Sequence, residues 1–243
     1  MEYRKSLSTV AVSLLLAVAA SSVAWTQAGA NGCSAHGTSI AFVGRTEGVE
    51  NYINGTPVTA TIGTPPNIQD GDFMLAIDHQ YNPTFPLAFP TGWTYVVSIN
   101  DFSHAPDDGD VFFKIWHTGD PTSFTFGSAQ APVNSTDFIM RVYRGAEAVD
   151  AFTGGYANAN LPVTIGALPP TSSNNETYVA FFTCRGAAGM TAPSDLLAVI
   201  PNTAVASIDG DKPLPNAGTV PNSETISAVA VGNCINFGIT LAK

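Results

Sequence analysis

The sequence predicts an all-β protein, an antiparallel β-sandwich that follows an N-terminal signal or anchor segment. From residue 38 onward, short runs rich in Val, Ile, Thr, Phe and Tyr alternate with clusters of Gly, Pro, Asn and Asp. The 22 glycines and 17 prolines supply the turns between these runs. No window after Ala30 has capped apolar residues at helical spacing, and regularly spaced short strands are typical of sandwiches and barrels.

The apolar runs give the expected strands in chain order. They are Ser39–Arg45, Pro57–Ile62, Asp72–His79, Trp93–Asn100, Val111–Thr118, Ser123–Phe126, Phe138–Arg144, Pro162–Ile165, Thr177–Cys184, Leu196–Ile200, Ala204–Ile208, Thr225–Val231 and Cys234–Leu241. The runs FMLAIDH, FIMRVYR and YVAFFTC are apolar on both faces, which indicates central strands covered on both sides. The alternate face of Val111–Thr118, with Phe112, Lys114 and Trp116, is expected near solvent. Asp209–Ser223 is expected to be a long loop, and no long repeat or domain linker is evident.

The first residues resemble an export signal. Arg4 and Lys5 precede a stretch without charge that runs to residue 24, and small residues permit cleavage after residue 24 or residue 30. An uncleaved anchor is the alternative, although the stretch is short for the roughly 20 residues that span a bilayer. We therefore expect a signal at 1–24 or 1–30, a flexible extension at 25–37, and a β-sandwich domain at 38–243. The expected location is extracellular or the cell surface, with a virion surface as the alternative.

Composition limits the partners. Charged residues make up 12% of the chain, about half the usual share of roughly 25%, so the surface should be largely neutral. Lys and Arg number 9 against 19 Asp and Glu, and the net charge is −10. A basic patch for phosphate backbones is absent from such a chain, so nucleic acid is not an expected partner.

The cysteines are too few and too scattered for a metal site of the CxxC kind. Cys184 and Cys234 both lie in β-like runs, so an exported chain could join them in a disulfide, while two buried thiols are the alternative. Cys33 would be left over, as a free thiol or an intermolecular bond.

The stretch Pro90-Thr91-Gly92-Trp93 predicts a turn that leads into a strand. Pro presets its φ angle, Gly supplies a backbone angle that other residues avoid, and Trp93 begins the extended run. A Trp at this position can close the open end of a sandwich, with its ring over the core. We favour this structural role over stacking on a ligand.

Five sequence features in a fixed order resemble a β-sandwich module of phage structural and appendage proteins and of exported bacterial surface proteins. They are GD before an apolar strand, P-x-G-W, an apolar run with Lys, P-x-S-x-x-F, and Y-R-G followed by a hydrophobic residue and Asp, over about residues 38 to 241. The resemblance implies a jelly-roll-like fold and a place on a particle, fibre or cell surface. It offers no catalytic residues to transfer.

Tyr143-Arg144-Gly145 also has a physical interpretation of its own. Arg144 ends an apolar strand, where its guanidinium can pair with a carboxylate such as Asp150 or Asp72, and Gly145 lets the chain turn. A structural clamp is the favoured role for this segment.

Motifs of catalysis are absent from the sequence. It contains no G-x-S-x-G, H-E-x-x-H, P-loop or G-x-G-x-x-G, so we do not expect an enzyme, although paired carboxylates of the glycosidase kind need not be adjacent in sequence. The four histidines lack metal-ligand spacing and are expected at the surface or rim: His36, His79, His104 and His117.

Asp-Gly-Asp occurs three times, at Asp70–Asp72, Asp108–Asp110 and Asp209–Asp211. Such segments favour turns, and they can also bind Ca²⁺. The best calcium candidates are Asp107, Asp108 and Asp110, and no other cofactor is expected. N-x-S/T triplets at Asn54, Asn134 and Asn175 would be glycosylation sites only in a host with that machinery.

Scarce charge, many apolar strands and a polar extension together predict a non-catalytic structural subunit of an extracellular or particle-surface assembly. The extension could add to a neighbour's sheet, giving a homo-oligomer or filament. The alternative is a carbohydrate- or receptor-binding module in which Trp116, Trp93 or Tyr81 stacks on a glycan.

Overall fold

The computed structural model describes residues 39–51, 59–81, 87–88, 90–101, 107–128, 134–157, 163–184, 190–202, 207–221, 223–226 and 234–243. In these ranges the regular structure is entirely β and all paired strands are antiparallel, which confirms the predicted fold class. The expected signal and extension lie outside the described residues, as do Cys33, His36, His104 and Asn54.

The strands fall into two consecutive groups. The first group is β1 (Ala41–Glu47), β2 (Val49–Asn51), β3 (Thr59–Gly63), β4 (Phe73–Tyr81), β5 (Leu87–Ala88), β6 (Thr94–Asp101), β7 (Asp107–Ile115), β8 (Ser123–Ser128) and β9 (Asn134–Arg144). The second group is β10 (Ala148–Ala157), β11 (Val163–Ile165), β12 (Glu176–Cys184), β13 (Leu197–Asn202), β14 (Ser207–Leu214), β15 (Glu224–Ile226) and β16 (Cys234–Ala242).

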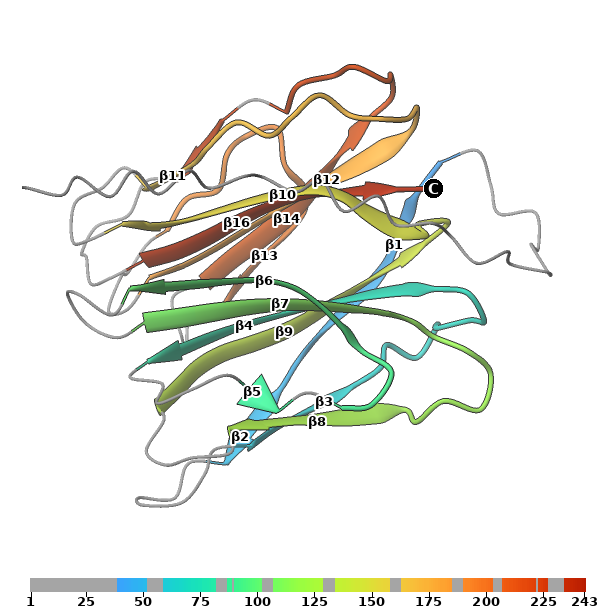
Figure 1. Ribbon diagram of the computed structural model, residues 1–243, viewed down its shortest axis with the longest axis vertical. Coiled ribbons are helices and arrows are strands. Elements are labelled where there is room, and N and C mark those ends of the chain that lie inside the picture. Colours follow the sequence, from blue (N-terminus) through green and yellow to red (C-terminus); the bar gives the residue numbers. More distant parts are fainter. Residues whose placement is uncertain are drawn as a thin grey trace, which may run out of the picture. The chain divides into compact units, whose positions relative to one another are not determined.

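Each group forms one large and one small sheet, and the four sheets lie in layers (Figure 1). The first large sheet has the order β1-β9-β4-β7-β6, and the first small sheet has the order β2-β3-β8-β5. The second large sheet is β10-β16-β12-β14-β13, and the second small sheet is β11-β15. The two large sheets face each other, and each small sheet covers the outer face of its own large sheet.

Three apolar clusters fill the spaces between the layers. The central cluster joins the large sheets through residues such as Phe73, Leu75, Phe181 and Phe237. The outer clusters lie under the small sheets and include Met74 with Phe126 on one side, and Phe182 with Ile165 on the other. Both faces of the central strands β4, β9 and β12 are therefore buried, as their continuous apolar runs predicted.

The second group of strands repeats the strand order of the first, a structural repeat that the sequence did not reveal. The strands β1, β9, β4, β7 and β6 correspond in order to β10, β16, β12, β14 and β13, and β3 and β8 correspond to β11 and β15. The described residues contain no counterpart of β2 or β5. The chain is thus a tandem of two related sandwich modules.

Local details recur at equivalent positions of the two modules. A β-bulge interrupts the start of β1 after Phe42 and the start of β10 after Val149. Another bulge interrupts both β6 and β13. Hydroxyl pairs link the strands of the small sheets, Thr61 with Thr125 at 3.0 Å and Thr164 with Thr225 at 2.9 Å.

The sequence signal for this repeat is short. TIGTPP ends β3, and TIGALPP ends β11 at the equivalent place. In both modules a residue with positive φ then precedes the central strand, Gly71 (84°) in the first module and Asn175 (61°) in the second. The carboxylates that follow, Asp72 and Glu176, each accept a hydrogen bond at 2.7 Å from the backbone N–H three residues earlier. The two modules share only a few residues at equivalent positions, because different side chains can occupy the same backbone arrangement.

Strand order within the first module is jelly-roll-like. One sheet contains the order β1-β9-β4-β7, and the facing sheet contains the order β3-β8-β5. The chain crosses between these two sheets as it does in a jelly roll, while β6 pairs with β7 and extends the larger sheet.

Three expectations about individual elements need correction. Asp209–Ser223 is not entirely a loop, because β14 continues to Leu214. Strand β10 was not predicted, since Gly154 and Gly155 weaken its β pattern. The short strands β2 and β5 were not predicted either.

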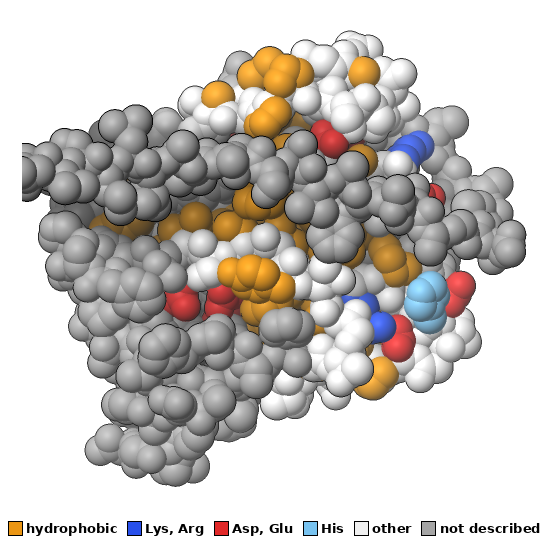
Figure 2. Space-filling model, viewed as in Figure 1, with side chains coloured by type: hydrophobic (Ala, Val, Ile, Leu, Met, Phe, Trp, Pro, Cys, Tyr) orange, Lys and Arg blue, Asp and Glu red, His pale blue; other side chains and the backbone are white. Residues whose placement is uncertain are grey.

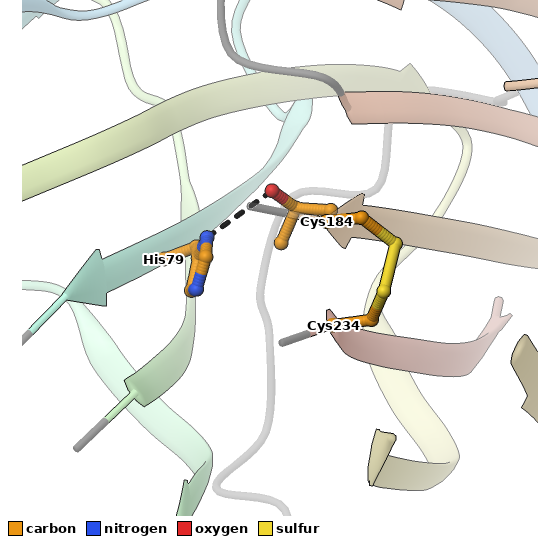
Figure 3. Close-up of a disulfide and its surroundings, with 4 residues drawn as sticks. His79, Cys184 and Cys234 are labelled. Carbon is orange, nitrogen blue, oxygen red and sulfur yellow. Dashed lines mark hydrogen bonds between the residues drawn. A yellow bond between two sulfur atoms is a disulfide. The ribbon is translucent and has the colours of Figure 1, made fainter. Parts of the chain in front are cut away.

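A disulfide joins the two central strands β12 and β16 of the second module (Figure 3). Cys184 and Cys234 lie directly opposite each other in the strand register, with Cα atoms 4.1 Å apart and both side chains buried. Next to the bridge, the buried His79 of β4 contacts Thr183 Oγ1 through Nδ1 at 3.1 Å. His79 and Thr183 occupy equivalent positions in the two modules, so the modules meet about a pseudo-twofold axis near this pair.

Candidate functional site

Trp93 lies inside the first module, over its outer cluster. Its ring is 5% exposed and makes edge-on contacts with Phe124 (5.2 Å between centroids) and Phe126 (5.1 Å). The turn before it is closed by a hydrogen bond from Trp93 N–H to the Pro90 carbonyl at 3.3 Å, and Gly92 adopts a φ of 87°. Leu196 occupies the same place in the second module, after a turn with the same hydrogen bond to Pro193.

The other aromatic candidates are less enclosed. Trp116 is half-buried at the margin of the same cluster, and its Nε1 donates to the Pro121 carbonyl at 3.4 Å. Tyr81 ends β4, and its side chain lies outside the described residues. The expectation that the face with Phe112 and Trp116 lies near solvent is wrong for Phe112, which is buried beneath the first small sheet.

Arg144 forms the expected clamp, and its partner is Asp72. Nε donates to Oδ1 and Nη2 to Oδ2, both at 2.9 Å, and Nη2 also donates to the Asn67 carbonyl at 3.0 Å. Asp150 instead accepts a hydrogen bond from Ser172 Oγ at 2.6 Å. The turn after Arg144 depends on Gly145, whose φ is 87°, a value that side chains other than glycine adopt with strain.

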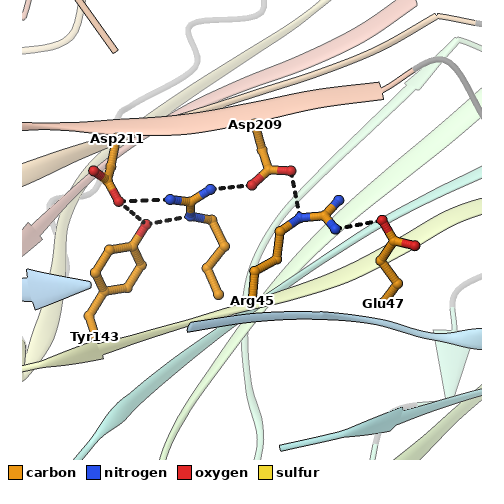
Figure 4. A network of polar contacts seen from close by, with 6 residues as sticks. Arg45, Glu47, Tyr143, Asp209 and Asp211 are labelled. Atoms are coloured by element: carbon orange, nitrogen blue, oxygen red, sulfur yellow. Dashed lines mark hydrogen bonds and ion pairs between the residues drawn. The ribbon is translucent and has the colours of Figure 1, made fainter. Parts of the chain in front are cut away.

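A second arginine forms a buried polar network between the two large sheets (Figure 4). Arg141 of β9 donates to Asp209 of β14 through Nη1 and to Asp211 of β14 through Nη2, the latter at 2.7 Å. Arg141 Nε donates to Tyr143 Oη at 2.7 Å, and Tyr143 Oη lies 3.2 Å from Asp211 Oδ2. Arg45 of β1 adds a hydrogen bond to Asp209 at 2.8 Å. No local sequence pattern indicates this role for Arg141, because its partners are 68 and 70 residues away in the chain.

The network is fully enclosed, since Arg141 is 0% exposed and Asp209 is 1% exposed. Burial by itself lowers the pKa of Arg141, but Tyr143, Asp209 and Asp211 raise it on balance, so the guanidinium stays charged. A buried charge with all partners in place is tolerated, whereas removal of one partner leaves the others unpaired. The arrangement therefore fixes how one module lies on the other.

The three Asp-Gly-Asp segments differ in structure. Asp70–Asp72 forms a turn, as expected, whereas Asp108–Asp110 lies within β7 and Asp209–Asp211 lies within β14, which corrects the preference for turns. The described residues contain no group of three or more His, Cys, Asp or Glu side chains that could hold a metal ion. Of the calcium candidates, Asp108 and Asp110 are buried, and the side chain of Asp107 lies outside the described residues.

Among the calcium candidates, the pKa of Asp110 is raised to about 7. Burial and the neighbouring Asp108 carboxylate raise it, and the hydrogen bond from Ser98 opposes part of this shift. Asp78 of β4 lies directly opposite Asp110 in the strand register. Ser98 Oγ donates to Asp108 Oδ1 at 2.7 Å. A protonated Asp110 relieves repulsion among these carboxyl groups.

The histidine and asparagine candidates lie apart from one another. The expectation of surface histidines is wrong for His79, which is buried, while His117 is exposed with Nδ1 at 3.6 Å from Asp70. Asn175 is exposed in the turn before β12, and Asn134 begins β9.

Comparison with protein-family models, curated proteins and solved structures finds no match for the chain. In the described ranges, no helix has the length and apolar character needed to cross a membrane.

Truncation of the buried indole tests its structural role. Trp93→Ala should lower the free energy of unfolding by about 3 to 5 kcal/mol, because it leaves a cavity between Phe124 and Phe126. Trp116→Ala is the matched control and should cost less, since Trp116 is half-buried. Denaturant unfolding measures both, and unchanged stability of the Trp93 variant with loss of glycan binding would show that the indole is a ligand platform.

The repeat supplies a direct test of the polar network. Arg141→Ile alone should cost about 3 to 5 kcal/mol, because Asp211 and Tyr143 lose the guanidinium while Asp209 keeps Arg45. A triple variant that adds Asp209→Val and Asp211→Phe copies the apolar residues found at the equivalent positions, Ile239, Val111 and Phe113. It should recover part of that loss, because the buried Tyr143 hydroxyl is then left without Arg141 and Asp211.

In the triple variant Arg45 keeps Glu47 as its ion-pair partner. Urea denaturation of the wild-type, single and triple variants measures the three stabilities. A triple variant less stable than the single one would contradict the idea that the charges serve module pairing and can be replaced by apolar packing.

Asp110 makes stability depend on pH. Its folded-state pKa of about 7 lies above the ordinary value of 3.8, so the folded protein retains a proton that the unfolded chain has lost between these values. Stability is therefore fully present below about pH 4 and falls as the pH rises to about 7, by at most about 4 kcal/mol. Asp110→Asn should remove this fall, as measured by thermal unfolding from pH 4 to 8.

Asp70→Asn serves as the control for this experiment, because Asp70 is exposed and its backbone hydrogen bond from Thr118 lowers its pKa. The control should retain the fall in stability. The assignment to Asp110 is wrong if Asp110→Asn and Asp70→Asn show the same pH profile.

Proposed function

We propose that the chain is a non-catalytic structural subunit of an extracellular or particle-surface assembly, such as a filament, a coat or a virion decoration. The observation that carries the proposal is that the basic side chains named next form ion pairs within the domain. Arg45, Arg141, Arg144, Lys114 and Lys212 each pair with a carboxylate of the same domain. These groups join strands and sheets rather than line a site.

The described carboxylates with raised pKa values also favour a structural role. Asp108 and Asp110 are 6% and 2% exposed, beneath the layer formed by the first small sheet, so a substrate in solution cannot reach them without opening the module. A catalytic acid needs contact with the group that it protonates.

The surface supports the same proposal. On the face shown in Figure 2, charged side chains are few and scattered among neutral and apolar ones across the described part of the surface. The disulfide and the double burial of three central strands give a rigid unit that suits a repeating subunit. Contacts between copies would then depend on shape, backbone groups and apolar side chains rather than on long-range charge.

Light scattering of the full chain over a range of concentrations, with electron microscopy of the same samples, tests the proposal. The expected result is a mass that increases with concentration and particles of regular outline. A protein that stays monomeric at every concentration and binds a polysaccharide would overturn the proposal in favour of the binding-module alternative.

A further inference from the structure

Of the four edge strands of the large sheets, β10 is the least protected within the described residues. The four outer strands of the large sheets are β1, β6, β10 and β13. Natural sheet edges are usually blocked by charge, proline or a bulge. β1 carries Arg45 and Glu47, β13 contains Pro201, and a bulge interrupts β6.

β10 lacks these features over most of its length. From Ala151 to Ala157 the strand has no charged residue and no proline, and it pairs with β16 in an uninterrupted register. Its outer backbone groups can therefore accept another strand.

The margin that contains β10 carries apolar side chains, whereas at the opposite margin Arg45 of β1 is paired with Asp209 and Leu197 of β13 is 57% exposed. Phe152 of β10 is 46% exposed, and Ile99 of β6 packs over Gly154, where a Cβ would lie 2.6 Å from the Ile99 side chain. Arg45 occupies the position equivalent to Phe152 and is held by Asp209. Among the described residues, the pseudo-twofold symmetry is thus broken: the β10 margin combines the exposed ring of Phe152 with an edge strand that has no charge or proline from Ala151 to Ala157, whereas Arg45 occupies the equivalent place at the other margin.

Residues 25–38 have the composition of a strand that would fit this edge. They carry no Asp, Glu, Lys or Arg, and most are Gly, Ala, Ser, Thr or Asn. Small residues can approach the edge beside Gly154 and Gly155 closely, and backbone hydrogen bonds need no particular side chains. The fourteen residues that remain after cleavage at residue 24 reach at most about 50 Å when extended, enough to cross from one copy to the next.

The position of β1 favours a second copy as the donor. The segment enters the domain at β1, which lies at the opposite edge of the first large sheet from β6, roughly 19 Å away at the usual strand spacing. β6 packs against β10, so β1, the first strand after the segment in the chain, lies at the margin far from the β10 edge of its own domain. A copy placed head to tail presents the segment to that edge directly.

We propose that the β10 edge, Ala151–Ala157, receives residues 25–38 of a second copy as an added strand. This inference rests on the proposed function. Each copy then donates a segment at one margin and accepts one at the other. Such a heterologous contact does not close on itself unless the rotation between copies forms a ring, so repetition gives a filament or a ring.

Disulfide trapping in the full chain tests this contact. Thr153→Cys places a thiol on the β10 edge, and Cys33 supplies the natural partner thiol. Mild oxidation should give a ladder of covalent multimers on a non-reducing gel, with a peptide that joins residues 33 and 153. The matched control, Val199→Cys on the β13 edge, should give no ladder, and adding Cys33→Ser to the Thr153 variant should abolish it.

Each other outcome overturns the inference in a distinguishable way. A 153–153 crosslink would mean that β10 pairs with itself in a closed dimer, and a 33–153 bond within a monomer would mean that the segment folds back on its own domain. Multimers by light scattering without any crosslink at residue 153 would reject the β10 edge but leave the proposed function standing. Absence of multimers in the wild-type chain would reject both.

Discussion

The guanidinium of Arg141 between Asp209 and Asp211 is the interaction on which the arrangement of the two modules depends. Apolar faces attract each other without a preferred direction, so Phe, Ile and Val at the central layer would tolerate several placements of one large sheet on the other. A planar arginine with two carboxylates and a tyrosine hydroxyl is satisfied in one placement only. Misplacement would leave buried charges unpaired, which costs several kcal/mol.

This constraint explains how two modules of the same strand order form one unit. Each module covers the outer face of its large sheet with its own small sheet, but the inner face stays apolar and needs a second sheet. The other module supplies it, as the second subunit does in a symmetric dimer. The residues equivalent to Arg141, Asp209 and Asp211 are apolar, so the polar network lies at one margin of the interface only.

The same asymmetry leads to the proposed assembly. Burial of both large-sheet faces removes the broad apolar surfaces on which a partner could pack, and charge closes the margin near β1 and β14. Among the described residues, the β10 edge and the exposed ring of Phe152 lie at the other margin. An edge of this kind is either protected or used for pairing. We infer that the β10 edge is used for pairing, because the chain also carries an uncharged segment of suitable length, residues 25–38.

The sequence by itself determined the fold class, most of the strands and the central position of β4, β9 and β12, because burial on both faces leaves a continuous apolar run that is a local property. It also identified the Trp93 turn, the pairing of Cys184 with Cys234 as one of two alternatives, and Asp72 as one of two partners for Arg144.

Tertiary structure alone decided the features that depend on partners far along the chain. Asp-Gly-Asp favours a turn locally, yet Asp209–Asp211 is a buried strand because Arg141 and Arg45 neutralise its carboxylates from the facing sheet. Gly154 weakens the local strand signal of β10, yet only glycine leaves room there for Ile99. The structural repeat was not evident in the sequence for the same reason, namely that it depends on residues far apart in the chain. The two modules share the pairing of their strands, and this pairing does not require the same amino acids in both.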